Sequence, residues 1–229
     1  MKIDLVVLDM AGTTVRDNDA VNECLRKALA ADSVPVTRDE INEVMGIAKP
    51  IAIRKVLERH RNGEPVSDER VDAVHHAFVE CMLRHYQAGP GVEPMPHAIV
   101  ALSQLKEAGV RIALDTGFNR PIVDAILERL GWRDSGLLDA TVASDEVHRG
   151  RPHPDLLFRA MALTGVRDPQ AVAKVGDTPA DLREGKAAGA GLIIGVTNGS
   201  HTVLELEPHP HTHLIPDLAR LPELVLSHI

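Results

Sequence analysis

The sequence predicts an α/β fold built on a parallel sheet, with a smaller helical domain inserted into it. Residues 5–8 form a continuous apolar run with two adjacent valines, which is typical of a strand buried on both faces of such a sheet. From residue 94 onward strand-like and helix-like patterns alternate, and repeated βα units give a parallel sheet with right-handed crossovers. Residues 20–87 show helical periodicity throughout, so they are expected to interrupt the sheet-forming part of the chain.

The remaining elements are expected in a regular order. In the insertion, Thr37 has the spacing of a capping box to Glu40 and Ser67 has the position of an N-cap, so each is expected to begin a helix. The later helices are expected at 98–108, 120–130, 154–164 and 179–188, and the later strands at 110–115, 140–143, 171–175 and 191–195.

Two short segments are expected to act as hinges between the domains. They are residues 15–18 and the turn cluster Gly89-Pro90-Gly91. Residues 1–16 and 90–229 are therefore assigned to the core domain, and residues 17–89 to the inserted helical domain.

Composition excludes several classes of partner. The chain has 229 residues and is 44% hydrophobic, which is enough for a sizeable core with an inserted domain. Its net charge of -8 and its aromatic content of 2% argue against a nucleic-acid groove or an anionic membrane surface. We expect the partner to be a small anionic substrate, with neither nucleic acid nor membrane.

The two cysteines and the apolar segments bear on the cellular compartment. Cys24 and Cys81 are far apart and fit no Cys-x-x-Cys pattern, and the chain shows neither an apolar leader nor an apolar run of about 18 residues. We expect reduced thiols that pack as small apolar residues, in a cytoplasmic protein.

Residues suited to phosphoryl chemistry follow three of the predicted strands. Asp9 ends the first strand, Thr116 and Gly117 follow a second, Asp177 follows a third, and Arg151 precedes a helix. The carboxyl ends of the strands form the binding crevice of open α/β sheets, so these residues are expected to meet there. Taken singly, Asp9 could instead cap a helix, and Arg151 could form a surface ion pair.

The order and type of these motifs resemble the haloacid dehalogenase superfamily of phosphotransferases over nearly the whole chain. The resemblance implies a Rossmann-like core with an inserted cap domain, and a hydrolase in which Asp9 attacks phosphorus to form an aspartyl-phosphate. It also implies one Mg²⁺ held by Asp9, Asp177 and the carbonyl group of Ala11. Asp181, one helical turn after Asp177, would support these ligands without binding the ion.

The same resemblance assigns the phosphoryl-binding groups. They are expected to come from Ala11, Gly12, Thr116, Gly117 and Arg151. Lys174 is the alternative to Arg151 as the cation of this motif.

Ala11 is the informative departure from the usual pattern, in which a second aspartate stands at this position. A methyl group can neither protonate a leaving alkoxide nor activate water. The variant resembles the phosphonatase branch of the superfamily, which implies that Lys49 forms a Schiff base with a carbonyl-bearing phosphonate. The leaving carbon then departs as a neutral enamine and needs no general acid at position 11. The apolar neighbours of Lys49 would depress the pKa of its amine.

Two positions depart from the phosphonatase branch. Ala52 stands where that branch has a histidine three residues after its lysine, and Phe118 stands where it has a tyrosine. The identity of the carbonyl phosphonate and the formation of the imine by Lys49 are therefore left open. Two other functions also remain open: a phosphatase acting on a small phosphate ester, and a non-catalytic protein that binds Mg²⁺ and an anion.

Two further features receive an expectation. The alternating residues His209, His211 and His213 resemble a metal cluster, but two nearby prolines and an exposed approach to the last strand favour a solvated linker. The family resemblance also implies a homodimer formed through the helices of the cap.

Overall fold

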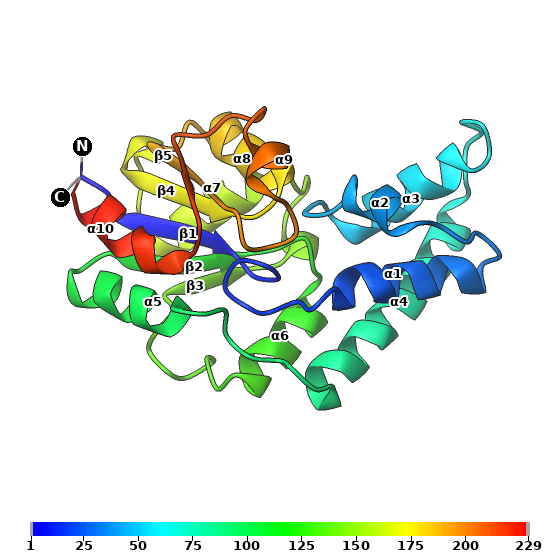
Figure 1. The fold of residues 1–229 in the computed structure, drawn as a ribbon, viewed down its shortest axis with the longest axis horizontal. Coiled ribbons are helices and arrows are strands. Elements are labelled where there is room, and N and C mark those ends of the chain that lie inside the picture. Colours follow the sequence, from blue (N-terminus) through cyan, green and yellow to red (C-terminus); the bar gives the residue numbers. More distant parts are fainter. Residues whose placement is uncertain (1, 228–229) are drawn as a thin grey trace.

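A computed structural model of the protein describes residues 2–227. Within that range the strands form one six-stranded parallel sheet in the order β3-β2-β1-β4-β5-β6. Figure 1 shows helices on both faces of this sheet and a separate group of helices, α1–α4, beside it. The predicted α/β fold with a parallel sheet is confirmed.

The bounds of the elements follow the predicted order. The strands are β1 (Leu5–Asp9), β2 (Arg111–Asp115), β3 (Ala140–Val142), β4 (Val172–Gly176), β5 (Leu192–Val196) and β6 (His213–Ile215). The helices beside the sheet are α1 (Ala20–Ala31), α2 (Arg38–Asn42), α3 (Lys49–Arg59) and α4 (Asp68–Ala88). The others are α5 (Ala98–Glu107), α6 (Arg120–Arg129), α7 (Asp155–Thr164), α8 (Pro179–Ala188), α9 (Val203–Leu206) and α10 (Leu221–Leu226), with 3-10 turns η1 (Ser144–Glu146), η2 (Pro169–Ala171) and η3 (Leu218–Arg220).

The central strand β1 is buried on both faces, as its apolar sequence requires. Val6 and Leu8 belong to the hydrophobic cluster that includes α5 and α6, whereas Leu5 and Val7 belong to the cluster that includes α7 and α8. Successive side chains of a strand point to opposite faces, so this alternation places one helical layer on each side of the sheet.

Local capping signals define two of the helices beside the sheet. Thr37 begins α2 with a complete capping box to Glu40, and Ser67 begins α4 by accepting a hydrogen bond from the Arg70 backbone amide. Both N-caps agree with the sequence prediction.

Two chain segments connect the four-helix segment, residues 17–89, to the sheet, and they run side by side. The Arg16 amide donates to the Glu93 carbonyl at 2.9 Å, and the Met95 amide donates to the Thr14 carbonyl at 2.9 Å. Asn18 adopts a left-handed backbone with φ 47°. The first segment includes the predicted hinge 15–18, and the second follows the predicted turn cluster 89–91. The hinges and the division into core and cap domains stay predictions.

The cysteine prediction was wrong, because Cys24 of α1 and Cys81 of α4 form a disulfide with a Cα–Cα distance of 5.7 Å. Helices α1 and α4 pack against each other, which brings together two residues that are 57 positions apart in the sequence. Helical periodicity identified the apolar face of each helix but not which residues face each other across the interface.

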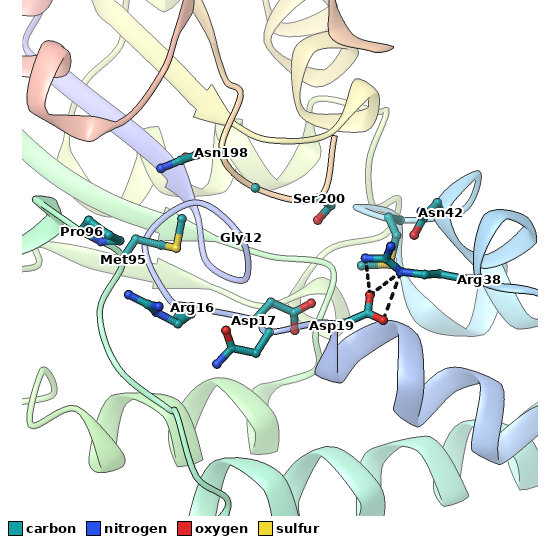
Figure 2. Close-up of a pocket in the computed structure, with 13 residues that line it drawn as sticks. Gly12, Arg16, Asp17, Asp19, Arg38, Asn42, Met95, Pro96, Asn198 and Ser200 are labelled. Carbon is teal, nitrogen blue, oxygen red and sulfur yellow. Dashed lines mark hydrogen bonds and ion pairs between the residues drawn. The ribbon is translucent and has the colours of Figure 1, made fainter. Parts of the chain in front are cut away.

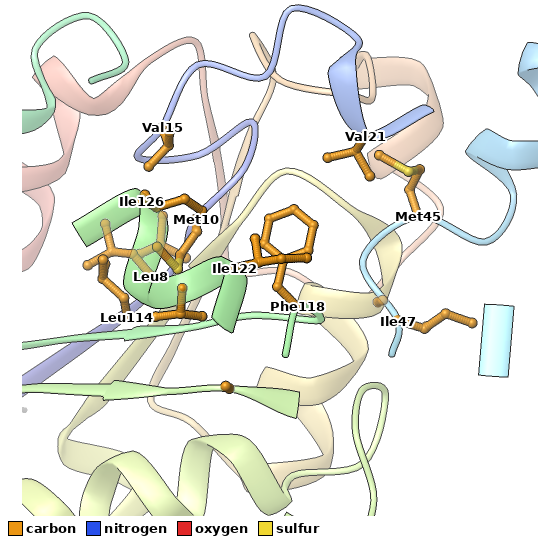
Figure 3. Packing of buried hydrophobic residues seen from close by; sticks show 14 of the residues in the cluster. Leu8, Met10, Val15, Val21, Met45, Ile47, Leu114, Phe118, Ile122 and Ile126 are labelled. Carbon is orange, nitrogen blue, oxygen red and sulfur yellow. The ribbon is translucent and has the colours of Figure 1, made fainter. Parts of the chain in front are cut away.

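The hydrophobic core continues from the sheet into the four-helix segment. Figure 3 shows Phe118 and Ile122 near Val21 and Met45, and all four belong to one buried cluster. None of the helices in residues 2–227 combines the length and apolarity that crossing a membrane requires.

Candidate active site

The candidate active site lies where the central strands end. Asp9 is the last residue of β1 and pairs in register with Asp115, the last residue of β2. Asp177 directly follows β4, the neighbour of β1 on the other side. Parallel strands bring their carboxyl ends to one edge, so three carboxylates from distant parts of the chain meet here. All three are buried.

Asp177 is held by a close-packed backbone cradle. Its Oδ1 accepts a hydrogen bond from the Thr13 hydroxyl at 2.9 Å, and its Oδ2 accepts one from the Ser200 amide at 2.6 Å. A Cβ atom at either Gly12 or Gly199 would lie 2.4 Å from Asp177 Oδ2. Any larger residue at these two positions would displace the carboxylate.

A buried ion-pair network lies behind Asp9. Arg151 Nη1 donates to Asp9 Oδ1 at 2.6 Å, and the guanidinium also pairs with Asp181 at 2.9 Å and Glu184 at 2.9 Å. Asp115 accepts a further hydrogen bond from the same guanidinium. Every nitrogen of Arg151 therefore has a carboxylate partner, and its predicted direct contact with a phosphoryl group stays a prediction.

Lys174, the alternative cation of the sequence analysis, belongs to the same network. Its ammonium pairs with Asp115, with Glu184 at 3.0 Å and with Asp181 at 3.3 Å. Burial alone would lower the pKa of Lys174, but these carboxylates outweigh it and raise that pKa. The structure thus brings both candidate cations to one place.

The network sets the ionisation of the carboxylates. Burial raises the pKa of Asp9 to about 8, with Asp181 and Asp177 adding to the rise and Arg151 opposing it. Burial also raises the pKa of Asp115, but Arg151 and Lys174 outweigh it, and the net shift is downward. Because burial favours the neutral form of Asp9, a further cation beside it would favour its ionised form.

The carboxylates fit a divalent metal ion. One ligand oxygen from each of Asp9, Asp177 and Asp181 lies within 4.8 Å of the others. Burial and the charge of Asp181 raise the pKa of Asp177. The protein around Asp177 therefore disfavours its charged form, which a bound cation would stabilise. Hard carboxylate oxygens are the ligands that Mg²⁺ prefers. In a second group, formed by Asp115, Asp181 and Glu184, every member is paired with Arg151 or Lys174, whereas Asp177 of the first group accepts hydrogen bonds from the neutral Thr13 and Ser200.

The loop before α3 packs directly on the sheet side of the site. A Cβ at Gly46, whose φ is +80°, would lie 2.2 Å from the Thr178 hydroxyl oxygen, and a Cβ at Gly117 would lie 2.7 Å from the Ile47 carbonyl oxygen. Glycine is therefore required on both sides of this contact. The close approach brings Lys49, the first residue of α3, against the ends of the strands.

Lys49 is buried in a small cavity with the nucleophile predicted from the sequence. The cavity, of about 20 Å³, is lined by Asp9, Ala11, Val21, Met45, Gly46, Lys49, Thr116, Gly117, Phe118, Thr178 and Ser200. Lys49 is 4% exposed, and its Nζ lies 5.6 Å from the centroid of the Phe118 ring. Burial lowers the pKa of Lys49 to about 8, although Asp9 and Asp17 oppose the shift. Roughly a tenth of this amine is thus neutral at pH 7, far more than for an exposed lysine.

A larger cavity of about 350 Å³ adjoins the small one, because Met45 and Ser200 line both. Figure 2 shows its walls: the loop from Gly12 to Asp19 on one side and the loop that carries Asn198 and Ser200 on the other. This cavity gives the buried site an open approach.

The predicted site residues mostly come together. Asp9, Ala11, Lys49, Thr116 and Gly117 line the small cavity, and Gly12 lines the larger one. The histidine stretch lies elsewhere: His209 contacts Arg183 at 3.4 Å, and His213 begins β6.

The sequence analysis missed four polar residues of the site. They are Asp17, Tyr86, Asp115 and Glu184. Glu184 had a detectable signal, because it follows Asp181 by three residues and so lies on the same face of α8. Tyr86 had none: its buried hydroxyl has no hydrogen-bond partner in residues 2–227, and its ring lies 6.0 Å from that of Phe118.

The fold and the site together define a hydrolase with an aspartate at the carboxyl end of its central strand. The chain belongs to the haloacid dehalogenase-like hydrolases, since the sequence model of that family matches residues 3–189. Within the family it is similar to the phosphonoacetaldehyde hydrolase of Lysinibacillus sphaericus, with 30% identity over 85% of this chain and 76% of that protein.

Solved structures share the fold at lower identity. A phosphonoacetaldehyde hydrolase-like protein from Oleispira antarctica has a TM-score of 0.85 at 20% identity, over 100% of this chain and 93% of that one. A putative phosphoglycolate phosphatase from Lactobacillus delbrueckii subsp. bulgaricus has a TM-score of 0.81 at 19% identity, over 98% of this chain and 99% of that one. At these identities the likeness concerns the fold alone.

Proposed function

We propose that the protein is a Mg²⁺-dependent hydrolase that cleaves the P–C bond of a small carbonyl phosphonate such as phosphonoacetaldehyde. The observation that carries this proposal is the burial of Lys49 in one small cavity with Asp9 and the methyl group of Ala11. An amine with a pKa of about 8 next to a carboxylate nucleophile suits imine chemistry better than ester hydrolysis. The similarity to proteins named phosphonoacetaldehyde hydrolase supports the same substrate class.

Each residue of the cavity has a separate role in the proposed reaction. The neutral amine of Lys49 adds to the carbonyl carbon, and loss of water gives an iminium group. The Asp9 carboxylate then attacks phosphorus, and the electron pair of the P–C bond moves into the iminium group to give a neutral enamine. Ala11 has no proton to give, and an enamine leaving group requires none at that position. Water finally hydrolyses both covalent links.

Other groups orient the substrate and control charge. The Thr116 hydroxyl and the Gly117 amide line the cavity beside Asp9, where they can donate to phosphoryl oxygens. Arg151 holds the Asp9 carboxylate in place from behind. Asp9, Asp177 and the Ala11 carbonyl would hold Mg²⁺, which, when bound, neutralises the charge on the phosphoryl oxygens.

Borohydride trapping tests the proposal. The protein is incubated with phosphonoacetaldehyde and Mg²⁺, reduced, and mapped by peptide mass, while phosphate release is measured on the same sample. We expect a reduced adduct on Lys49 together with phosphate. Lys49→Arg should lose the adduct and lower turnover on the order of 10³-fold or more, because guanidinium does not form the imine.

Lys55→Arg is the matched control, since Lys55 is an exposed lysine of the same helix α3 and should retain the adduct and turnover. Phosphate release from esters by a route that needs Asp9 but not Lys49 would contradict the proposal and favour a phosphatase. Absence of both adduct and phosphate release would contradict it in favour of a binding protein.

A further inference from the structure

Imine chemistry at Lys49 requires a group that carries protons. The carbinolamine loses its hydroxyl group only as water, and the enamine becomes a releasable aldehyde only after protonation at carbon. Ala52, three residues after Lys49, is a buried methyl group and cannot do this. The proton carrier must therefore come from another segment, one that faces this cavity or the larger cavity that adjoins it.

Four charged residues have the largest electrostatic effects on Lys49, and three of them are already engaged. Asp9 is the proposed nucleophile, while Arg151 and Asp181 are paired with each other at 2.9 Å in the buried network. The fourth is Asp17, which raises the pKa of Lys49 while Lys49 lowers that of Asp17. Asp17 lines the larger cavity together with Met45 and Ser200, which also line the Lys49 cavity, so the two side chains border adjoining spaces.

Asp17 also has the right access to solvent. Its Oδ1 accepts one hydrogen bond, from the Val21 amide at 3.0 Å, and no other described residue donates to its carboxylate. The side chain lines the cavity of about 350 Å³ that adjoins the Lys49 cavity, and Figure 2 shows it on the loop between Gly12 and α1. A carboxyl group that lines this cavity can regain a proton from water after it has given one away.

We propose that Asp17 is the proton carrier for the imine chemistry of Lys49. This inference rests on the proposed function. In acid form, Asp17 gives a proton to the carbinolamine hydroxyl, which leaves as water while the nitrogen lone pair forms the C=N bond. After P–C cleavage, a re-protonated Asp17 gives a proton to the enamine carbon, whose electron pair forms the new C–H bond. The resulting iminium group adds water and releases the aldehyde from Lys49.

The surroundings of Asp17 agree with this role. Burial raises its pKa to about 6, with Asp177 and Asp19 adding to the rise and the Val21 hydrogen bond and Lys49 opposing it. Burial raises the pKa of Tyr86 on α4, and the charges of Asp17 and Asp9 add to that rise. Asp19, two residues away, is paired with Arg38 at 3.0 Å.

The pH profile of adduct formation follows from these two groups. The reactive form needs Lys49 neutral, above a pKa of about 8, and Asp17 protonated, below a pKa of about 6. The rate should therefore be flat between about pH 6 and 8 and fall on both sides. Without the Asp17 carboxyl, the fall above pH 8 should disappear, and the rate should rise with pH to a plateau.

The test measures the rate of borohydride-trapped adduct formation on Lys49, with and without Mg²⁺, over this pH range. Asp17→Asn keeps an oxygen for the Val21 amide, and we expect it to slow adduct formation by roughly 10²-fold or more. Asp17→Ala should be rescued by added formate, which the larger cavity can admit. A purely structural role would show neither rescue nor a changed profile.

His75 of α4 is the rival carrier, because Lys49 lowers its pKa as well. His75→Asn should leave the rate within about twofold of wild type. Loss of adduct formation in His75→Asn, or an unchanged rate and profile in Asp17→Asn, would overturn the inference while the wild-type adduct still supported the proposed function. Absence of any wild-type adduct would overturn both.

Discussion

Arg151 lies directly behind Asp9 and donates from Nη1 to the Oδ1 atom of that carboxylate at 2.6 Å, with none of its own side-chain surface exposed. The same guanidinium also pairs with three further carboxylates, those of Asp115, Asp181 and Glu184. Arg151→Met would leave Asp9 buried without its cation partner, and would leave Asp115, Asp181 and Glu184 with Lys174 alone. We expect it to lower the free energy of unfolding by roughly 3–5 kcal/mol, as for other broken buried ion pairs, and to abolish turnover. Urea denaturation and a phosphate-release assay measure the two effects.

Arg149→Met provides the control for Arg151→Met. Arg149 lies two residues away and pairs with Asp155 at 3.2 Å, but its side chain is 55% exposed. An exposed pair of this kind contributes about 0–1 kcal/mol. Equal losses in the two variants would show that Arg151 contributes only as a surface charge.

The burial of Lys49 should reduce stability in a pH-dependent way. Its pKa falls from 10.5 in the unfolded chain to about 8 in the folded protein, so between these values the unfolded state binds more protons. Stability should therefore rise with pH from about 8 to 10.5, and the full cost, roughly 3 kcal/mol, should be present below pH 8. Lys49→Met removes this cost.

We expect Lys49→Met to be more stable than wild type at pH 7 and inactive in imine formation. The stability difference should shrink as pH rises toward 10. Urea denaturation at pH 7 and pH 9.5 measures it. A variant less stable than wild type at pH 7 would mean that the ammonium is stabilised in place, for example by the Phe118 ring at 5.6 Å.

Gly46 should be required for the loop that carries Lys49 to reach the site. Gly46→Ala combines a φ of +80° with a Cβ placed 2.2 Å from the Thr178 hydroxyl oxygen. Gly63→Ala has a similar φ of +86° but meets nothing within 4 Å. Gly63→Ala should therefore cost only the backbone strain, about 1–2 kcal/mol.

Gly46→Ala should cost the same strain and, in addition, displace the loop. We expect a larger loss of stability and a fall in the rate of adduct formation on Lys49, which Gly63→Ala should not show. Thermal unfolding and borohydride trapping separate the two effects. Equal behaviour of the two variants would mean that the contact between Gly46 and Thr178 does not position Lys49.

The sequence predicted those parts of the fold and site that depend on local pattern. Asp9 ends a strand, Thr116 and Asp177 each follow one, and strand ends can be located from apolar runs and turn residues. The predictions that Thr37 and Ser67 are helix N-caps were correct, because an N-cap residue bonds to backbone groups within three residues of it. The boundaries of most elements differ from the predicted ones by only one or two residues.

The residues that the sequence analysis missed depend on how distant elements pack. Asp17 carries no motif of its own, and its role follows only from the cavity that it shares with Ser200, 183 positions later. Arg151 was predicted from the sequence, but its burial among carboxylates was not, because that depends on the packing of α8, which carries Glu184, against it. Pairing of this kind is set by tertiary contacts and leaves no local periodicity.

The disulfide between Cys24 and Cys81 leads to the last prediction. It joins α1 to α4 across a separation of 57 residues, so in the chain-entropy view it restricts the unfolded state by about 4 kcal/mol. We expect the double variant Cys24→Ser, Cys81→Ser to lose stability of this order, measured by urea denaturation. Peptide mapping of the unreduced wild-type protein should recover the two cysteine peptides as one linked species.

A reductant provides the matching control, because it should destabilise the wild-type protein and leave the double variant unchanged. Both cysteines lie in the four-helix segment, away from the strands that carry Asp9 and Asp177, so turnover below the unfolding temperature should change little. Two free thiols in the unreduced protein would contradict the disulfide and restore the expectation from the sequence. A large loss of turnover without unfolding would instead show that the packing of α1 on α4 sets the position of Lys49.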